Sequence, residues 1–312
     1  MNKIIRFYNK NRRIIWIFIV VTIGIIALMS ALQKNYKSKD EEEKRRRSSS
    51  TNSTTTSSNN YSIITRKEIT EDTNKNLLKI IDDFMNYCNN GQIEKAYELL
   101  SDDCKNTLFE NIDIFKENYY NNIFSEYRLY SVQAWIVNEK EGYTYQVEIT
   151  DDILSKGQSS LDMSIIDYFT IVMQNGEYKL NINNYIGKQN INFTGTQDNI
   201  EIYIPYKKSY ADYEVYQIQI RNNNNFNILL DTKKYEDKMY LLGETGQAYG
   251  AFVNELTTTD LEVKSNSVKT INVKFNKSYN PKYGVEALVF SDMTINYGTN
   301  EEQKGTVKID FK

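Results

Sequence analysis

One apolar run constrains this chain more than any other feature. Residues Ile14 to Gln33 read IIWIFIVVTIGIIALMSALQ and include no charged side chain. A helix of about 20 such residues is long enough to cross a hydrocarbon core ~30 Å thick. Trp16 lies near one end, where an indole ring prefers the level of the lipid headgroups. The run therefore predicts a transmembrane helix over 14–33. A buried soluble helix and a cleaved signal peptide stay open as alternatives.

The charges on either side of this run bear on its orientation. Five basic residues precede it within the tail 1–13, and seven follow it between 34 and 47. Basic residues weigh most when they lie close to the span, and Arg12 and Arg13 adjoin it. We expect a single-pass protein of the cell membrane with the N-terminus inside and the bulk of the chain extracytoplasmic. The reverse orientation stays open.

A polar spacer separates this segment from the rest of the chain. Residues 34–69 begin with a charged stalk, and the tract SSSTNSTTTSSNN over 48–60 has no apolar side chain. Such a tract cannot bury enough apolar surface to offset the entropy cost of ordering. We expect a flexible linker that holds the body of the protein away from the bilayer.

Composition excludes several classes of chemistry. The chain has no histidine and only two cysteines, so Ser-His and Cys-His catalysis, His-ligated metals and a Cys-only structural zinc site are excluded. Residues 1–47 contain 12 of the 38 basic residues and 4 of the 41 acidic residues, so the remaining chain holds 26 basic and 37 acidic residues, a net charge of −11. An acidic body is a poor partner for nucleic acid. We expect no cofactor, no metal and no nucleic-acid partner.

Helical periodicity opens the first predicted domain, residues 70–188. Within 74–90, the apolar residues recur at the spacing of one helix face, and they are Leu77, Ile80, Ile81, Phe84 and Cys88. Residues 92–100 and 105–124 repeat this pattern and predict a second and a third helix.

The apolar period then changes to two. Residues 131–137 and 143–150 alternate, and Asn175-Gly176 lies between two further strand patterns as a two-residue hairpin turn. Helices followed by an antiparallel sheet predict an α+β fold class.

A family resemblance accompanies this pattern. The run DFMNYCNNGQIEKAYELLSDDCKNTLF, residues 83–109, resembles the opening of NTF2-like domains of the cystatin/SnoaL-like cone fold. The resemblance covers about 70–188 and implies three helices on a curved antiparallel sheet. Similar domains occur in membrane-anchored Gram-positive envelope and conjugative-transfer proteins. The matching residues Tyr97, Leu99 and Leu100 build the fold, so the resemblance transfers no catalytic residue.

Some relatives with this fold are isomerases or cyclases, with an Asp base and Tyr or acid donors inside the cone. The resemblance makes Asp82, Asp83, Asp167, Tyr87 and Tyr145 the candidates here. No spacing pairs a base with a donor, so we predict no catalytic residue. A small-ligand binder or an acid/base enzyme that uses the cone pocket remains the alternative.

Trp135 is a candidate interface residue. Strict alternation puts it on one face of its strand with Ser131 and Gln133, opposite Val132, Ala134 and Ile136. If the smaller apolar set faces the core, Trp135 lies on the outer face of the sheet and could pack on a second copy or on the next domain. A core position for Trp135 is equally compatible with the pattern.

Cys88 and Cys104 are the two cysteines of the chain. In an extracytoplasmic domain they could form a disulfide. Two buried free thiols are the alternative, because free cysteine packs as a small hydrophobic residue.

Only strand patterns are found in the second predicted domain, residues 196–312. Seven or eight short alternating segments separated by polar turns predict an antiparallel β-sandwich of immunoglobulin-like type. A second cone-fold domain is the alternative. Asp231, Asp260 and Asp292 are scattered and form no calcium-loop motif, and GETGQAYG over 243–250 indicates a β-turn.

These features together predict a non-catalytic module for protein binding or assembly, anchored in a membrane and belonging to a cell-envelope or conjugative-transfer complex. The expected partners are the lipid bilayer and either other proteins or further copies of this chain.

Overall fold

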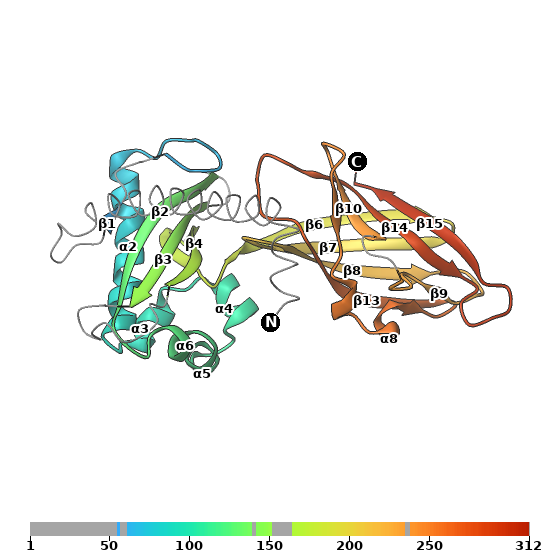
Figure 1. The fold of residues 1–312 in the computed structure, drawn as a ribbon, viewed down its shortest axis with the longest axis horizontal. Helices are drawn as coiled ribbons and strands as arrows, with labels where there is room; N and C mark the ends of the chain where they lie inside the picture. Colours follow the sequence, from blue (N-terminus) through green and yellow to red (C-terminus); the bar gives the residue numbers. More distant parts are fainter. Residues whose placement is uncertain (1–54, 57–60, 139–141, 152–163, 235–237, 312) are drawn as a thin grey trace, which may run out of the picture. The chain divides into compact units, whose positions relative to one another are not determined.

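The described part of the protein is built mainly from antiparallel β-sheet. The structure, a computed structural model, describes residues 55–56, 61–138, 142–151, 164–234 and 238–311. Strands account for 49% of it and helices for 22%. All of these residues belong to one compact unit, Thr54–Lys312. The strands of this unit form three sheets of five, six and four strands (Figure 1).

This architecture corrects the predicted fold class. The α+β class, with a transmembrane helix, a cone domain over 70–188 and an immunoglobulin-like sandwich over 196–312, is wrong, because the described chain is mostly antiparallel sheet. Helical periodicity predicted longer helices than the structure has: among the described residues, no helix after α2 (Glu71–Asn89) exceeds seven residues, whereas several strands have nine to thirteen. No helix among the described residues is long and apolar enough to cross a membrane. The predicted span 14–33, with Ile14, Trp16 and Gln33, lies outside them.

Six of the helices in the described chain lie between residues 71 and 123. They are α2 (Glu71–Asn89), α3 (Ile93–Glu98), α4 (Asp102–Leu108), α5 (Ile112–Phe115), the π-helical turn η1 (Lys116–Tyr120) and α6 (Asn121–Ile123). In α2, the apolar residues at helical spacing are all buried, which confirms the predicted helix face. The Ser101 side chain caps α4 by accepting a hydrogen bond from the Cys104 N–H.

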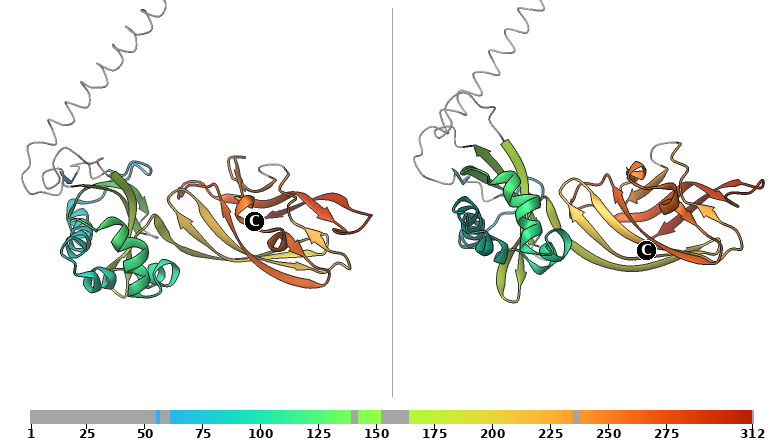
Figure 2. Two further views of the ribbon diagram at one scale, coloured as in Figure 1. Left: turned by 60° about the horizontal axis from the view of Figure 1, so that its bottom comes forward. Right: turned by 90° about the horizontal axis from the view of Figure 1, so that it is seen from below.

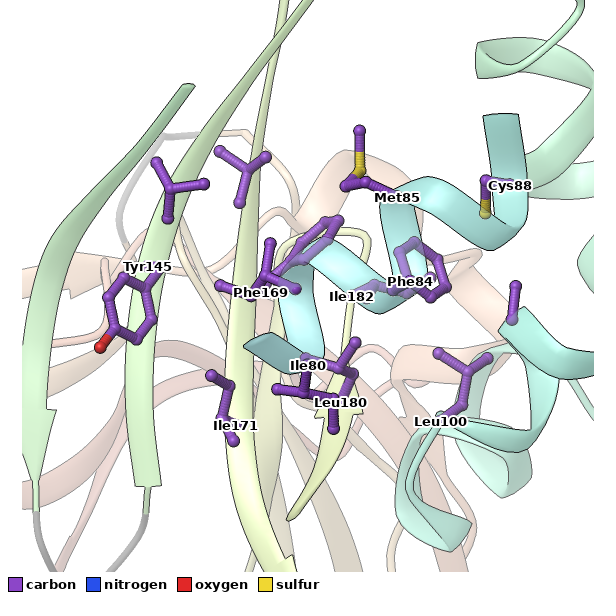
Figure 3. Packing of buried hydrophobic residues seen from close by; sticks show 14 of the residues in the cluster. Ile80, Phe84, Met85, Cys88, Leu100, Tyr145, Phe169, Ile171, Leu180 and Ile182 are labelled. Carbon is purple, nitrogen blue, oxygen red and sulfur yellow. The ribbon is translucent and has the colours of Figure 1, made fainter. Parts of the chain in front are cut away.

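These helices pack on one face of the five-stranded sheet. Its order is β1 (Thr55–Thr56), β2 (Arg128–Asn138), β3 (Gly142–Asp151), β4 (Ser164–Gln174) and β5 (Glu177–Asn181). Figure 3 shows side chains of α2 meeting those of β3, β4 and β5. Phe84 and Phe169 pack edge to face with ring centroids 5.4 Å apart. We call the cluster of buried hydrophobic residues between these helices and this sheet the first core.

Two sheets enclose a second core in the rest of the chain (Figure 2). The four-stranded sheet has the order β13 (Ser267–Phe275), β8 (Glu214–Asn222), β7 (Ile200–Tyr210) and β6 (Tyr185–Gln197). The other has the order β11 (Ala248–Gly250), β10 (Met239–Gly243), β14 (Val285–Ile295), β9 (Ile228–Leu229) and β12 (Glu262–Val263), with β15 (Gln303–Asp310) also on β14. The short helices η2 (Val253–Glu255) and α8 (Thr258–Leu261) precede β12.

Strand β6 contributes to both cores. Tyr185, at its start, is buried in the first core, whereas Ile191 and Phe193 pack against the second. The strand runs without interruption between these positions. The two cores are therefore connected through one continuous strand.

Candidate protein-binding surface

The face of the five-stranded sheet that points away from the helices carries two exposed apolar side chains, Leu129 and Ile166. In β3, Tyr145, Val147 and Ile149 point into the first core, so the residues between them point the other way. Cross-strand register extends this surface to the neighbouring strands. The outer face, as we name it, consists of Leu129, Ser131, Gln133, Trp135, Ile136, Thr144, Gln146, Glu148, Thr150, Ser164, Ile166, Tyr168 and Thr170.

A β-bulge in β2 sets the position of Trp135. Ala134 pairs with Tyr145 and Ile136 pairs with Thr144, so Trp135 is an extra residue in its strand. The extra residue interrupts the alternation and places Trp135 and Ile136 together on the outer face. The Trp135 ring lies against Tyr168, with centroids 4.3 Å apart.

One end of the outer face is covered by the same chain. Ile136, Ile186 and Tyr279 form a buried cluster, and Trp135 and Ile64 pack against it. Tyr279 belongs to the segment after β13, and its N–H donates to the Ala211 carbonyl at 3.1 Å. The predicted interface residue Trp135 thus contacts residues beyond its own sheet, and a role for it between copies stays a prediction.

At the opposite end of the outer face, two apolar side chains of the described chain are exposed. Leu129 and Ile166 are 46% and 51% exposed. Polar residues lie between them, since Ser131 pairs with Glu148 and Glu148 pairs with Ile166. Exposed apolar side chains interspersed with polar ones are typical of protein-binding surfaces.

Two of the candidate catalytic carboxylates lie on the surface side of α2. Asp83 forms an ion pair with Lys79, one helical turn before it, at 2.5 Å. Asp82 accepts a hydrogen bond from the Tyr130 hydroxyl at 2.8 Å. Burial raises the pKa of Asp82, and this hydrogen bond offsets part of the increase. Within the described chain, no hydrogen bond or ion pair joins Asp82 or Asp83 to Asp167.

Asp167 is buried in the first core and is fully engaged by donors. The Tyr119 hydroxyl donates to it at 2.8 Å, and the backbone N–H groups of Asn184, Asn183 and Tyr168 donate at 2.7, 3.1 and 2.7 Å. Asn183 and Asn184 have φ angles of 60° and 61°, so the carboxylate stabilises a left-handed turn before β6. Burial raises the pKa of Asp167 against the opposing effect of its hydrogen bonds. These contacts indicate a structural role.

The remaining candidates are also held by internal contacts. The Tyr145 hydroxyl donates to Asn74 Oδ1 at 2.7 Å, and the Lys95 ammonium lies 5.5 Å from the ring centroid of Tyr87. Cys88 and Cys104 are free thiols buried in the first core. Burial raises the pKa of the Cys88 thiol and raises that of Cys104 to about 12. A reactive cysteine needs a lowered pKa, so these thiols serve as packing residues.

Sequence reasoning missed a buried ionic cluster in the second core. Glu214, which is fully buried, accepts hydrogen bonds at Oε1 from Lys207 Nζ at 2.9 Å and Lys277 Nζ at 3.0 Å. The Tyr216 hydroxyl donates to Oε2 at 2.9 Å. Burial opposes ionisation of Glu214, but the two lysines outweigh it and lower the pKa. Pro205 is a local sequence signal for this region, because proline inside a strand often marks a bulge. The β7–β8 register does shift between Tyr203 and Lys207, the lysine of the cluster.

In the part of the chain that the structure describes, no three Asp, Glu, His or Cys side chains come together as a metal-binding group. Comparison of the chain with protein-family models, curated proteins and solved structures gave no match. The similarity of residues 83–109 to NTF2-like domains therefore stays a prediction.

Proposed function

We propose that this protein is a non-catalytic protein-binding module that is held at a cell membrane by its N-terminal segment and takes part in an envelope or transfer assembly. The observation that carries the proposal is the end of the outer face at which Leu129 and Ile166 are exposed. Each side chain is already about half buried, so a partner that covers it completely would gain roughly half of the ~1.5–3 kcal/mol that full burial of such a side chain contributes.

Polar groups between these two residues can supply specificity. Glu148 accepts hydrogen bonds from Ser164 Oγ at 3.2 Å and from Ser131 Oγ at 3.5 Å. The two serines orient the carboxylate, which is half-buried and adjacent to the apolar pair. A partner with an apolar patch and a basic or amide donor would fit this arrangement.

The state of the candidate catalytic groups also supports a non-catalytic role. Asp167 is engaged by four donors, and Asp82 and Asp83 each have a partner of their own. A general base needs a free position toward its substrate. Attachment to a membrane rests on the sequence of residues 14–33 and on the polar tract after it.

Site-specific photo-crosslinking of the full chain in native membranes tests the binding role. A photoreactive amino acid at Leu129 or Ile166 should give one discrete adduct of the same mass from both positions. Val268 is a matched control, because it is also an exposed apolar residue on a strand, 43% exposed, in the other part of the chain. Absence of adducts at 129 and 166, or the same adducts at 268, would contradict the proposal.

Membrane attachment is tested separately. The full chain should stay in the membrane fraction after washing at high pH, and a chain that lacks residues 1–33 should not. Recovery of both forms in the soluble fraction would contradict attachment but would leave the binding role intact.

A further inference from the structure

Two aspartates that are 61 positions apart in the sequence come together beside the six-stranded sheet. Asp231 follows β9, and Asp292 lies in β14. The β14–β15 register shifts between Phe290 and Met293, which is the typical effect of a bulge and redirects side chains locally. Both aspartates are buried, at 1% and 9% exposure. Thr232 joins them, since its hydroxyl donates to Asp292 Oδ2.

The carboxylate of Asp231 is only half satisfied. Its Oδ1 accepts a hydrogen bond from the Lys233 N–H at 2.6 Å. Its Oδ2 is buried and has no hydrogen-bond partner within the described chain. Burial raises the pKa of this carboxyl, the Lys233 N–H opposes the increase, and the charge of Asp292 adds to it. A buried carboxylate oxygen without a partner destabilises the fold, and a bound cation would relieve this cost.

Direct contacts compensate only part of the charge of this pair. Lys304 Nζ lies 2.9 Å from Asp292 Oδ1 and also donates to Thr294 Oγ1 at 3.1 Å. The Lys233 ammonium also favours ionised Asp231 through its charge, but its hydrogen bond goes to the Leu256 carbonyl. The Lys304 side chain is 54% exposed, so it can move into solvent without the loss of a packed position. The hydrogen bond of Lys304 reaches Asp292 and leaves Asp231 Oδ2 unpartnered.

We propose that Asp231 and Asp292, with the Thr232 hydroxyl, form a binding site for a divalent cation of the calcium type. All of the donors are oxygen atoms. Hard cations such as calcium bind oxygen ligands, whereas softer transition metals favour nitrogen and sulfur ligands. Asp231 Oδ2 supplies the open coordination position, and water completes the shell. With so few protein ligands, we expect weak affinity, roughly 10⁻⁴–10⁻³ M, as in extracellular calcium modules. Bound cation would link the turn after β9 to β14.

The third aspartate considered in the sequence does not belong to this site. Asp260 accepts hydrogen bonds from the N–H and hydroxyl of Thr257 at the start of α8, as part of a capping box. Its carboxylate already has the partners that it needs, in contrast to Asp231.

Thermal unfolding and titration calorimetry of the full chain in detergent test the proposal, with calcium chloride or magnesium chloride as the probe and sodium chloride at matched ionic strength as the reference. Calcium should raise the midpoint of unfolding, with half of the effect at roughly 0.1–1 mM. Asp231→Asn should weaken binding at least about tenfold. An equal response to sodium chloride, or an unchanged response in Asp231→Asn, would overturn the proposal.

Lys304→Met distinguishes a cation site from a simple ion pair and does not depend on the folding of the aspartate variant. If a cation binds here, removal of the competing ammonium should tighten calcium binding about tenfold, and calcium should restore the stability of this variant. If Lys304 is itself the counter-ion, the loss of stability will be the same with and without calcium, which would overturn the proposal. Lys308→Met is the matched control, because Lys308 lies on the same strand, is similarly exposed and pairs with Asp310; its response to calcium should equal that of the native chain.

Discussion

The two cores each contain a buried carboxylate, and they compensate its charge in opposite ways. Asp167, in the first core, is surrounded by neutral donors, one hydroxyl and three backbone N–H groups. Glu214, in the second core, is paired with two lysines and a tyrosine hydroxyl. The pKa of Asp167 is raised and that of Glu214 is lowered, although burial raises both.

This difference shows that dipoles and charges are not equivalent partners for a buried acid. Neutral donors satisfy the oxygen atoms but leave a net negative charge in a medium of low dielectric constant. An ammonium group satisfies the oxygen atoms and also neutralises the negative charge. Because two lysines pair with Glu214, the cluster as a whole has a net positive charge. The first core should thus tolerate neutralisation of its acid much better than the second.

The largest expected effect is that of Glu214→Gln. This change leaves Lys207 and Lys277 without a negative partner, and Lys277 is 3% exposed. Removal of one partner from a buried ion pair costs about 3–5 kcal/mol. We expect a decrease of that size in the free energy of unfolding, measured with urea. The matched control is Glu201→Gln, because Glu201 pairs with Arg221 at the surface, and it should cost less than about 1 kcal/mol.

Asp167→Asn should have a smaller effect. The amide oxygen of the asparagine can still accept hydrogen bonds from the surrounding donors. The NH₂ group that replaces the second carboxylate oxygen cannot accept them, so the donors on that side lose their partner. Unsatisfied buried groups of this kind cost about 1–3 kcal/mol. The same urea experiment measures the change. A loss equal to that of Glu214→Gln would show that the two acids are compensated alike.

The pH dependence of stability should differ in sign between the two acids. The pKa of folded Glu214 lies below its ordinary value of 4.5, so its contribution is complete above that pH and is lost as the pH falls through the folded value. The pKa of folded Asp167 lies above its ordinary value of 3.8, so its contribution is complete below that pH and is lost as the pH rises through the folded value.

Unfolding free energies of the native chain and both variants between about pH 3 and 7 measure this difference. The deficit of Glu214→Gln should shrink toward acid, and that of Asp167→Asn should shrink toward neutral pH. Parallel curves for the two variants would contradict the assignment.

The smallest effect should come from a change outside both cores. Ile166→Ser removes a side chain that is 51% exposed, so the free energy of unfolding should change by no more than about 0.5 kcal/mol. Partner crosslinking at Leu129 should nevertheless decrease. A large loss of stability would mean that Ile166 supports the fold, and the reduced crosslinking would then carry no information on binding.

Local features of the fold could be predicted from the sequence, because they depend on neighbouring residues. The buried face of α2 follows from the spacing of Leu77, Ile80, Ile81 and Phe84. The turn at Asn175-Gly176 does join β4 and β5, and both residues have positive φ, 53° and 86°. The predicted third helix over 105–124 is instead divided into α4, α5, η1 and α6, and the Asn111 side chain caps α5 after the break.

Features that depend on distant residues could not be predicted in this way. Alternation left the face of Trp135 open and put Ile136 on the face opposite to it, whereas the bulge places both on the outer face, because an extra residue in a strand leaves no trace in a pattern of period two. The partners of Glu214 include a lysine 63 positions away, and Asp231 and Asp292 are similarly distant. Only the tertiary fold brings such groups together.

The continuity of β6 has a practical consequence for dissection of the molecule. A cut near residue 190 would sever a hydrogen-bonded strand, because β6 pairs with β7 on both sides of that position. A fragment that begins there would retain β7 but lose the first part of β6, and would therefore expose the edge of β7 over residues 206–210 and invite aggregation through strand pairing. Truncation studies should keep residues 185–210 intact in whichever fragment is expressed.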